Sequence, residues 1–136
     1  MEFLEKINLS DNNLSGADVA DVLKSLYDKP VKMVNLGKNV LGKDGGMAVL
    51  DFLEKSEGGV GGHIEELELE GCRVGENLTY KIMAELLVYN AKSLVKVSFA
   101  GNGLKGKRGG RGGLEEIKTF MKGCKKLEEM DLSWNR

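Results

Sequence analysis

One pattern of apolar residues recurs five times along the 136 residues of the chain. Its first copy reads LEKINLSDNNL from Leu4, with apolar residues at the first, fourth, sixth and eleventh positions and Asn12 at the ninth. The later copies read VKMVNLGKNVL, IEELELEGCRV, LVKVSFAGNGL and LEEMDLSWNR. They start at Val31, Ile64, Leu94 and Leu127. Such a repeat predicts a stack of similar units that bury their apolar faces on one another.

Each copy is expected to begin with a short strand and a turn. The fourth and sixth positions, Ile7 and Leu9 in the first copy, are two residues apart and so lie on one face of a strand. The ninth residue stands where the chain leaves the strand, and a buried asparagine there can bond backbone groups that no neighbouring strand reaches. The same position holds Asn39, Cys72, Asn102 and Asn135 in the later copies.

The segments between the strands are predicted to be helical. The copies start 27, 33, 30 and 33 residues apart, which exceeds the usual range of roughly 20–29 and leaves room for a full helix. Apolar residues at helical spacing predict helices over 17–26, 47–53, 78–89 and 114–121, with Met47, Leu114 and Met121 on buried stripes. The glycines at 16, 45 and 113 are interpreted as turns that precede three of these helices.

These copies resemble leucine-rich repeats, and the alternation of strand and helix is similar to that of the ribonuclease-inhibitor-like subfamily over essentially the whole sequence. The resemblance implies an α/β solenoid of about five repeats, with parallel strands on the concave face and α-helices on the convex face. It also implies a binding role, since this subfamily includes inhibitors, GTPase activators, actin-capping proteins and innate sensors. Two insertions, SEGGVGGH at 56–63 and KGKRGGRGG at 105–113, depart from the pattern and are interpreted as loops.

Length and composition indicate one domain, residues 1–136, in the cytoplasm. The chain lacks an apolar run of about 20 residues and a signal-peptide pattern at its start, and its two cysteines do not form a disulfide framework. The net charge of −1 provides no overall attraction to nucleic acid or to an anionic membrane. Because the pattern starts at a strand and stops within a repeat, we interpret the chain as a fragment of a longer solenoid, or else as a unit that self-associates through uncapped ends.

The predicted strands carry an acidic surface. Glu66, Glu68 and Glu70 alternate along one strand, so they point to one side at intervals of roughly 7 Å. Glu129 and Asp131 occupy equivalent positions two strands away. We expect this face to bind a basic protein partner; the alternative is a solvated face that only keeps the protein soluble.

Two further residues complete the predicted partner-binding set. Lys96 belongs to the same column as Glu66 and Glu129. Trp134, the sole tryptophan, is either an exposed aromatic anchor or a side chain that packs over the neighbouring repeat. The full set is Glu66, Glu68, Glu70, Lys96, Glu129, Asp131 and Trp134.

A second function class depends on the basic loop. Two RGG triplets resemble the RGG boxes of RNA-binding proteins and the substrates of arginine methyltransferases. The cations that would contact phosphates are Lys105, Lys107, Arg108 and Arg111. Two triplets without an aromatic residue favour a plain flexible loop, so nucleic-acid association is the alternative rather than the leading function.

No catalytic or metal-binding pattern accompanies these features. The sequence has no Ser/His/Asp set, P-loop or dinucleotide fingerprint, and its glutamates lack the DxDxDG loop of a calcium site. The lone histidine, His63, is interpreted as an exposed turn residue. The sequence therefore predicts a non-enzymatic protein-interaction module without cofactors.

Overall fold

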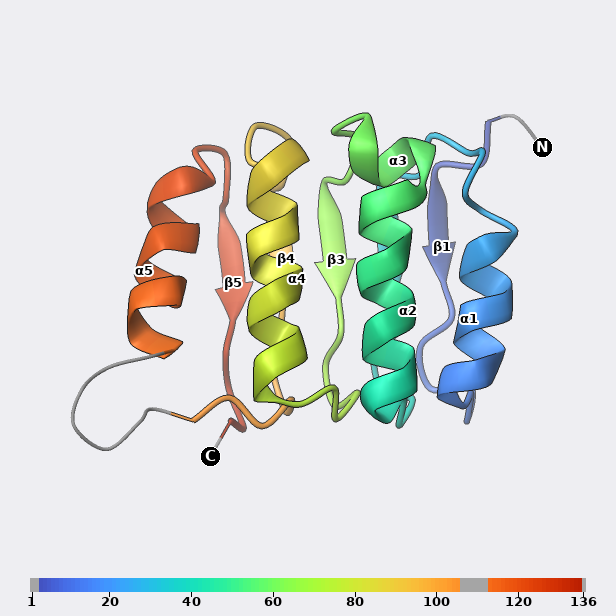
Figure 1. The fold of residues 1–136 in the computed structure, drawn as a ribbon, viewed down its shortest axis with the longest axis horizontal. Coiled ribbons are helices and arrows are strands. Elements are labelled where there is room, and N and C mark those ends of the chain that lie inside the picture. The colour runs from blue at the N-terminus through green and yellow to red at the C-terminus, as the bar shows by residue number, and fades with distance from the viewer. Residues whose placement is uncertain (1–2, 106–112, 136) are drawn as a thin grey trace.

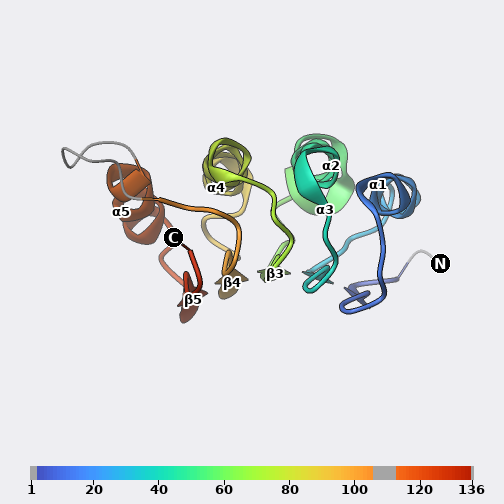
Figure 2. The ribbon, with the colours of Figure 1, turned by 90° about the horizontal axis from the view of Figure 1, so that it is seen from below.

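The computed structural model of the chain describes residues 3–105 and 113–135. Within these residues five short parallel strands form one sheet and pair in chain order. The strands are β1 (Lys6–Asn8), β2 (Met33–Asn35), β3 (Glu66–Glu68), β4 (Lys96–Ser98) and β5 (Glu129–Asp131). The helices are α1 (Gly16–Lys24), α2 (Gly42–Lys55), α3 (Glu57–Val60), α4 (Glu76–Tyr89) and α5 (Gly113–Gly123). The strands lie side by side across the molecule in chain order (Figure 1), and the described helices lie on one side of the sheet (Figure 2).

The alternation of strand and helix bends the stack into an arc. Seen along the strands, the helices occupy a wider arc than the strands, which line the inner, concave side (Figure 2). A helix is about 10 Å wide, whereas paired strands lie about 4.8 Å apart, so a repeated strand–helix unit has to curve this way. The predicted solenoid, with its concave sheet and convex helices, is confirmed.

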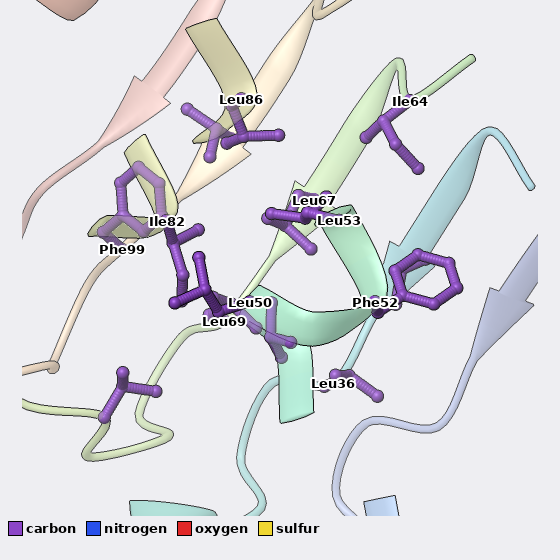
Figure 3. Close-up of a cluster of buried hydrophobic side chains, with 14 of the residues drawn as sticks. Leu36, Leu50, Phe52, Leu53, Ile64, Leu67, Leu69, Ile82, Leu86 and Phe99 are labelled. Atoms are coloured by element: carbon purple, nitrogen blue, oxygen red, sulfur yellow. The ribbon is translucent and has the colours of Figure 1, made fainter. Parts of the chain in front are cut away.

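The register of the strands follows the repeat. The third, fourth and fifth positions of each copy are paired across the sheet, as in the row Val34, Leu67, Val97 and Met130. The fourth and sixth positions of the three central copies form a continuous core and are each at most 1% exposed: Val34, Leu36, Leu67, Leu69, Val97 and Phe99. Figure 3 shows part of this core, where helix residues such as Leu53 and Ile82 come together with residues of the strands.

The ninth-position asparagines bond backbone groups, as predicted, and these bonds also join neighbouring repeats. Asn39 is fully buried; its amide oxygen accepts the backbone N–H groups of Asn12 and Leu14, at 3.0 and 2.9 Å. Its amide nitrogen donates to the backbone oxygens of Leu9 and Leu36. Asn102 and Asn135 make equivalent bonds between the later repeats. Each such asparagine therefore links two repeats through backbone groups that the sheet leaves unpaired.

Cys72 fills the ninth position of the third repeat with fewer bonds. Its thiol lies 3.3 Å from the backbone oxygen of Leu36, and it is fully buried. Burial raises the pKa of the Cys72 thiol to about 12, so the group is neutral and unreactive. Both Cys72 and Cys124 are free thiols.

The helix boundaries correct the interpretation of three glycines as turns. Gly45 lies inside α2, which begins at Gly42, and Gly16 and Gly113 are the first residues of α1 and α5 rather than turns before them. Close packing explains Gly16, because a Cβ atom there would lie 2.6 Å from the backbone nitrogen of Gly45 and 2.7 Å from the oxygen of Leu41.

The insertion at 56–63 is not a plain loop, so that prediction was wrong for its central part. The buried Ser56 caps a single helical turn, α3, by accepting the N–H of Gly59 at 2.9 Å. Gly59 packs against the backbone of Leu53 with no room for a side chain. Glycine in this segment thus permits close packing, which composition alone does not distinguish from flexibility.

Three residues assigned to buried stripes are exposed. Met47, Leu114 and Met121 are exposed by 40%, 53% and 50%. Helix α5 packs on α4 but on no helix on its other side within the described residues, so only one stripe, with Phe120 at its centre, is covered. No helix in the described part of the chain is long and apolar enough to span a bilayer.

Candidate protein-binding face

The strands bring the predicted acidic residues together on the concave face. Glu66, Lys96 and Glu129 are aligned across β3, β4 and β5, and the next outward row holds Glu68, Ser98 and Asp131. Carboxylates of β3 and β5 therefore stand on either side of β4, whose own side chain in the second row is the short Ser98.

A hollow of about 520 Å³ lies between these rows. Glu68 and Glu70 form one wall, Glu129 and Asp131 form the other, and Ser98, which is 6% exposed, lies at the floor. Glu128, which the sequence interpretation did not single out, also contributes to the lining. The only signal that could have indicated Glu128 is its outward second position in the fifth copy.

Lys96 closes one end of this hollow. Its Nζ atom lies 3.2 Å from Oε1 of Glu68 and 3.5 Å from Oε2 of Glu129. The hydrogen bond and charge of Glu68, followed by the charge of Glu129, raise the pKa of Lys96. One ammonium thus binds between carboxylates from two strands, and it offsets part of the negative charge that the sequence predicted for this face.

The fifth position of most copies has a local structural role. Asn8, Asn35 and Ser98 each accept the backbone N–H of the residue two positions later. Asp131 does the same for Ser133, with bonds to its N–H at 2.9 Å and to its hydroxyl at 2.6 Å. The hydroxyl and backbone bonds from Ser133 lower the pKa of Asp131, so its carboxylate stays charged in mild acid.

The third strand departs from this arrangement. Glu68 occupies the fifth position, and its carboxylate bonds across the sheet to Lys96 instead of to its own turn. Glu66 is half-buried and Glu70 is exposed; among the described residues neither forms an ion pair. Glu68 and Glu70 also line a second hollow of about 300 Å³ towards β1, together with Asn35 and Lys38. The two glutamates form a ridge between the hollows.

Trp134 is exposed rather than packed on the neighbouring repeat. Its side chain is 76% exposed, and its φ of 59° matches the positive φ of Asp11 and Lys38 at the same position of earlier copies. The turn at Trp134 therefore has the conformation found at this position in the earlier repeats. It leaves the indole ring available for contact next to β5.

The basic loop falls mostly outside the described residues. Lys105 is exposed, and its backbone N–H donates to Oε2 of Glu76 at 2.7 Å. Lys107, Arg108 and Arg111 are not among the described residues, so nucleic-acid binding by this loop stays a prediction. Within the described ranges no group of three or more His, Cys, Asp or Glu side chains is arranged to hold a metal ion.

Comparisons with known proteins agree with the fold. The family model described as Leucine Rich Repeat matches residues 3–25. The tropomodulin C-terminal domain of Caenorhabditis elegans is similar in structure with a TM-score of 0.69 and 14% identity, covering 97% of this chain and 75% of that one. Leiomodin-1 Actin-Binding Site 2 is similar with a TM-score of 0.70 and 17% identity, covering 93% and 69%. No curated relative matches the chain.

At these identities the two structures support the fold and not a shared activity. The family model covers the first repeat, and the paired register of all five strands extends the same pattern to β5. The chain therefore has the fold of a leucine-rich-repeat solenoid, with five strand-led repeats, the first of which matches the family model.

Proposed function

We propose that this protein is a non-enzymatic interaction module that binds a basic segment of a partner protein on its concave face. The observation that carries the proposal is the hollow over β4, which has carboxylates of β3 on one wall and carboxylates of β5 on the other. A face with one sign of charge on both walls attracts and orients a segment of opposite charge.

Lys96 indicates what kind of group fits. Its ammonium already lies between Glu68 and Glu129 at one end of the hollow. Towards the other end, Glu70 and Asp131 line the walls and Ser98 the floor, and no lysine or arginine of the described chain pairs with these carboxylates. A lysine or arginine of the partner would bind at this end of the hollow, in the same way that Lys96 binds at the other end.

Charge by itself gives modest affinity. Ion pairs on an exposed surface contribute about 0–1 kcal/mol each, so the acidic walls serve mainly to speed association and to select the partner. Trp134, beside β5, supplies the aromatic surface that such interfaces use as an anchor. We therefore expect the partner segment to carry an apolar side chain next to its cations.

The proposal is tested by selecting binding peptides from a random displayed library with the intact chain as bait. We expect the selected peptides to be enriched in lysine and arginine, and to lose binding to the double variant Glu68→Lys, Glu70→Lys. The matched control, Asp51→Lys with Glu54→Lys on α2, reverses two charges on the helical side and should retain binding. Peptides without cations, or equal loss in both variants, would rule out this face as the binding site.

Actin is the first individual protein to test, because one structural neighbour is named as an actin-binding site of leiomodin-1. Cosedimentation with actin filaments and a binding titration with monomeric actin would both be run on the wild type and the two double variants. Binding that the concave variant abolishes and the helical control retains would identify actin as a partner of this face. Absence of binding would exclude actin as a partner, and the peptide selection would then be the test of the proposed binding face.

A further inference from the structure

The fourth repeat contains a reactive dipeptide at a position that the fold depends on. Asn102 is the one asparagine in the sequence that is followed by glycine. In an Asn–Gly pair the backbone nitrogen of the glycine can attack the asparagine side chain, because glycine has no Cβ to hinder the approach. We propose that Asn102 is a self-modification site, which the folded repeat keeps unreactive and which converts to aspartate or isoaspartate when the repeat opens.

The chemical step needs only water. The Gly103 nitrogen gives up its proton and forms a bond to Cγ of Asn102, the bond from Cγ to Nδ2 breaks, and ammonia leaves. Water then opens the resulting five-membered imide at either carbonyl, which yields aspartate or isoaspartate. No atom is oxidised or reduced.

In the folded protein the side chain of Asn102 is buried and fixed by hydrogen bonds. It is 1% exposed; its amide nitrogen donates to the backbone oxygens of Leu69 and Ala100 at 2.7 and 3.0 Å. Its amide oxygen accepts the N–H of Val74 at 3.0 Å. These three bonds fix the side-chain amide, so a rotation of Cγ towards the Gly103 nitrogen would have to disturb them.

The backbone of Asn102 is fixed as well. Its N–H donates to the side chain of Asn135 at 2.9 Å, and its carbonyl accepts the N–H of Gly75 at 3.1 Å. Opening therefore requires separation from both neighbouring repeats, and the reaction rate should follow the fraction of molecules in which the repeat is open.

The product cannot regain the same bonds. An aspartate carboxylate has no hydrogen to donate, so at residue 102 it would face the oxygens of Leu69 and Ala100 with like partial charge. Isoaspartate would in addition lengthen the backbone by one carbon. Because Ser98 of the same repeat forms the floor of the acidic hollow, a chain modified at Asn102 is expected to lose the geometry of that face.

The test compares the full chain in buffer with the same chain in urea at one pH and temperature, and follows residue 102 by peptide mass mapping. Conversion of Asn102 should be fast in urea and slow in buffer. The ratio of the rate in buffer to the rate in urea should equal the fraction of open molecules measured by hydrogen exchange. The control is Gly103→Arg, since Arg73 holds this position of the third repeat with a φ of 52° and the nearest atom to a Cβ at Gly103 is 4.0 Å away. In urea this variant should convert several-fold more slowly.

Two results would overturn the proposal. One is conversion in buffer at the rate seen in urea, and the other is a rate in urea no higher at Asn102 than at the other asparagines. A parallel measurement tests the consequence without the slow chemistry: Asn102→Asp should lower the midpoint of urea unfolding much more than Asn12→Asp, whose amide is exposed. Equal effects of the two substitutions would show that the modified residue is tolerated in the buried position.

Discussion

At the scale of single residues, the buried asparagines pair with buried backbone groups, which an apolar residue of the same size could not do. Asn39 satisfies two donors and two acceptors of the backbone at once. Each of these groups, if buried without a partner, would cost about 1–3 kcal/mol. The polar residue is thus as much a part of the core as the leucines around it.

We therefore predict unequal effects for substitutions of the first two asparagines of the series. Asn39→Ala should lower the free energy of unfolding by at least ~2 kcal/mol, because it leaves several buried backbone groups unpaired. Asn12→Ala should cost under about 1 kcal/mol, because water replaces the bonds of an exposed side chain. Urea unfolding of both variants gives the comparison; similar losses would contradict it.

Core truncation gives a second residue-scale prediction. Leu69→Ala should cost about 2–5 kcal/mol, since Leu69 is 1% exposed between the sheet and the helices. Val40→Ala is the matched control, with a side chain that is 61% exposed, and it should cost under about 1 kcal/mol. A loss below about 1 kcal/mol at Leu69 would mean that the register of the repeat is wrong.

At the scale of helices and strands, the sequence predicted correctly which residues are buried where this follows from the period of the pattern. The prediction was wrong where burial depends on how neighbouring elements pack. The period of two in the strands correctly placed Val34, Leu67 and Val97 in the core. The helical period in α5 correctly included Phe120, but it could not reveal that no helix in the described residues covers Met121. Composition equally could not separate the packed glycines of 56–63 from a flexible loop.

The candidate site was predictable to a similar extent. Alternation placed Glu66, Glu68 and Glu70 on one face, and the repeat aligned Lys96 with Glu129. The ion pairs of Lys96 and the hydrogen bond between Asp131 and the N–H of Ser133 depend on side-chain conformation, so the sequence pattern could not predict them.

Two glycines test how closely the helices pack. Gly16→Ala should cost roughly 1–3 kcal/mol, the usual effect of overpacking, because the added methyl would meet backbone atoms of Leu41 and Gly45 that cannot turn aside. Gly123→Ala should change the stability by under about 1 kcal/mol, since the atom it meets is the end of the flexible Leu87 side chain. Thermal or urea unfolding would distinguish them, and equal losses would count against the close approach of α1 to α2.

The basic loop provides the remaining test at this scale. Arg108→Ala with Arg111→Ala should leave the stability within about 0.5 kcal/mol, as for surface substitutions generally. Filter binding of single-stranded RNA at two salt concentrations should show no binding before or after the change. Wild-type binding that falls steeply with salt and is lost in the double variant would instead favour the nucleic-acid alternative.

At the scale of the whole molecule, the outer repeats are less covered than the inner ones. The fourth and sixth positions of the first and last copies, Ile7, Leu9, Met130 and Leu132, are only partly buried, whereas the same positions of the three central copies are at most 1% exposed. Phe3 before β1 is 78% exposed and Leu114 on α5 is 53% exposed. We therefore predict that the 136-residue chain associates as its concentration rises. Light scattering over a concentration series would measure this, and a constant monomer mass throughout would contradict it.

The sulfur at residue 72 has a consequence for how the solenoid unfolds. At the ninth position Asn39 and Asn102 bond the preceding repeat through their side-chain amides, whereas Cys72 offers only a weak thiol donor to Leu36. The paired strands and the bonds from Leu41 and Gly42 to the carbonyl of Cys72 remain. In a linear array, cooperativity depends on the coupling between nearest neighbours. We therefore predict that this junction is the boundary between two cooperative blocks, the first two repeats on one side and the third to fifth repeats on the other. Native-state hydrogen exchange would then divide the amides of the chain into two protection classes that meet between α2 and β3.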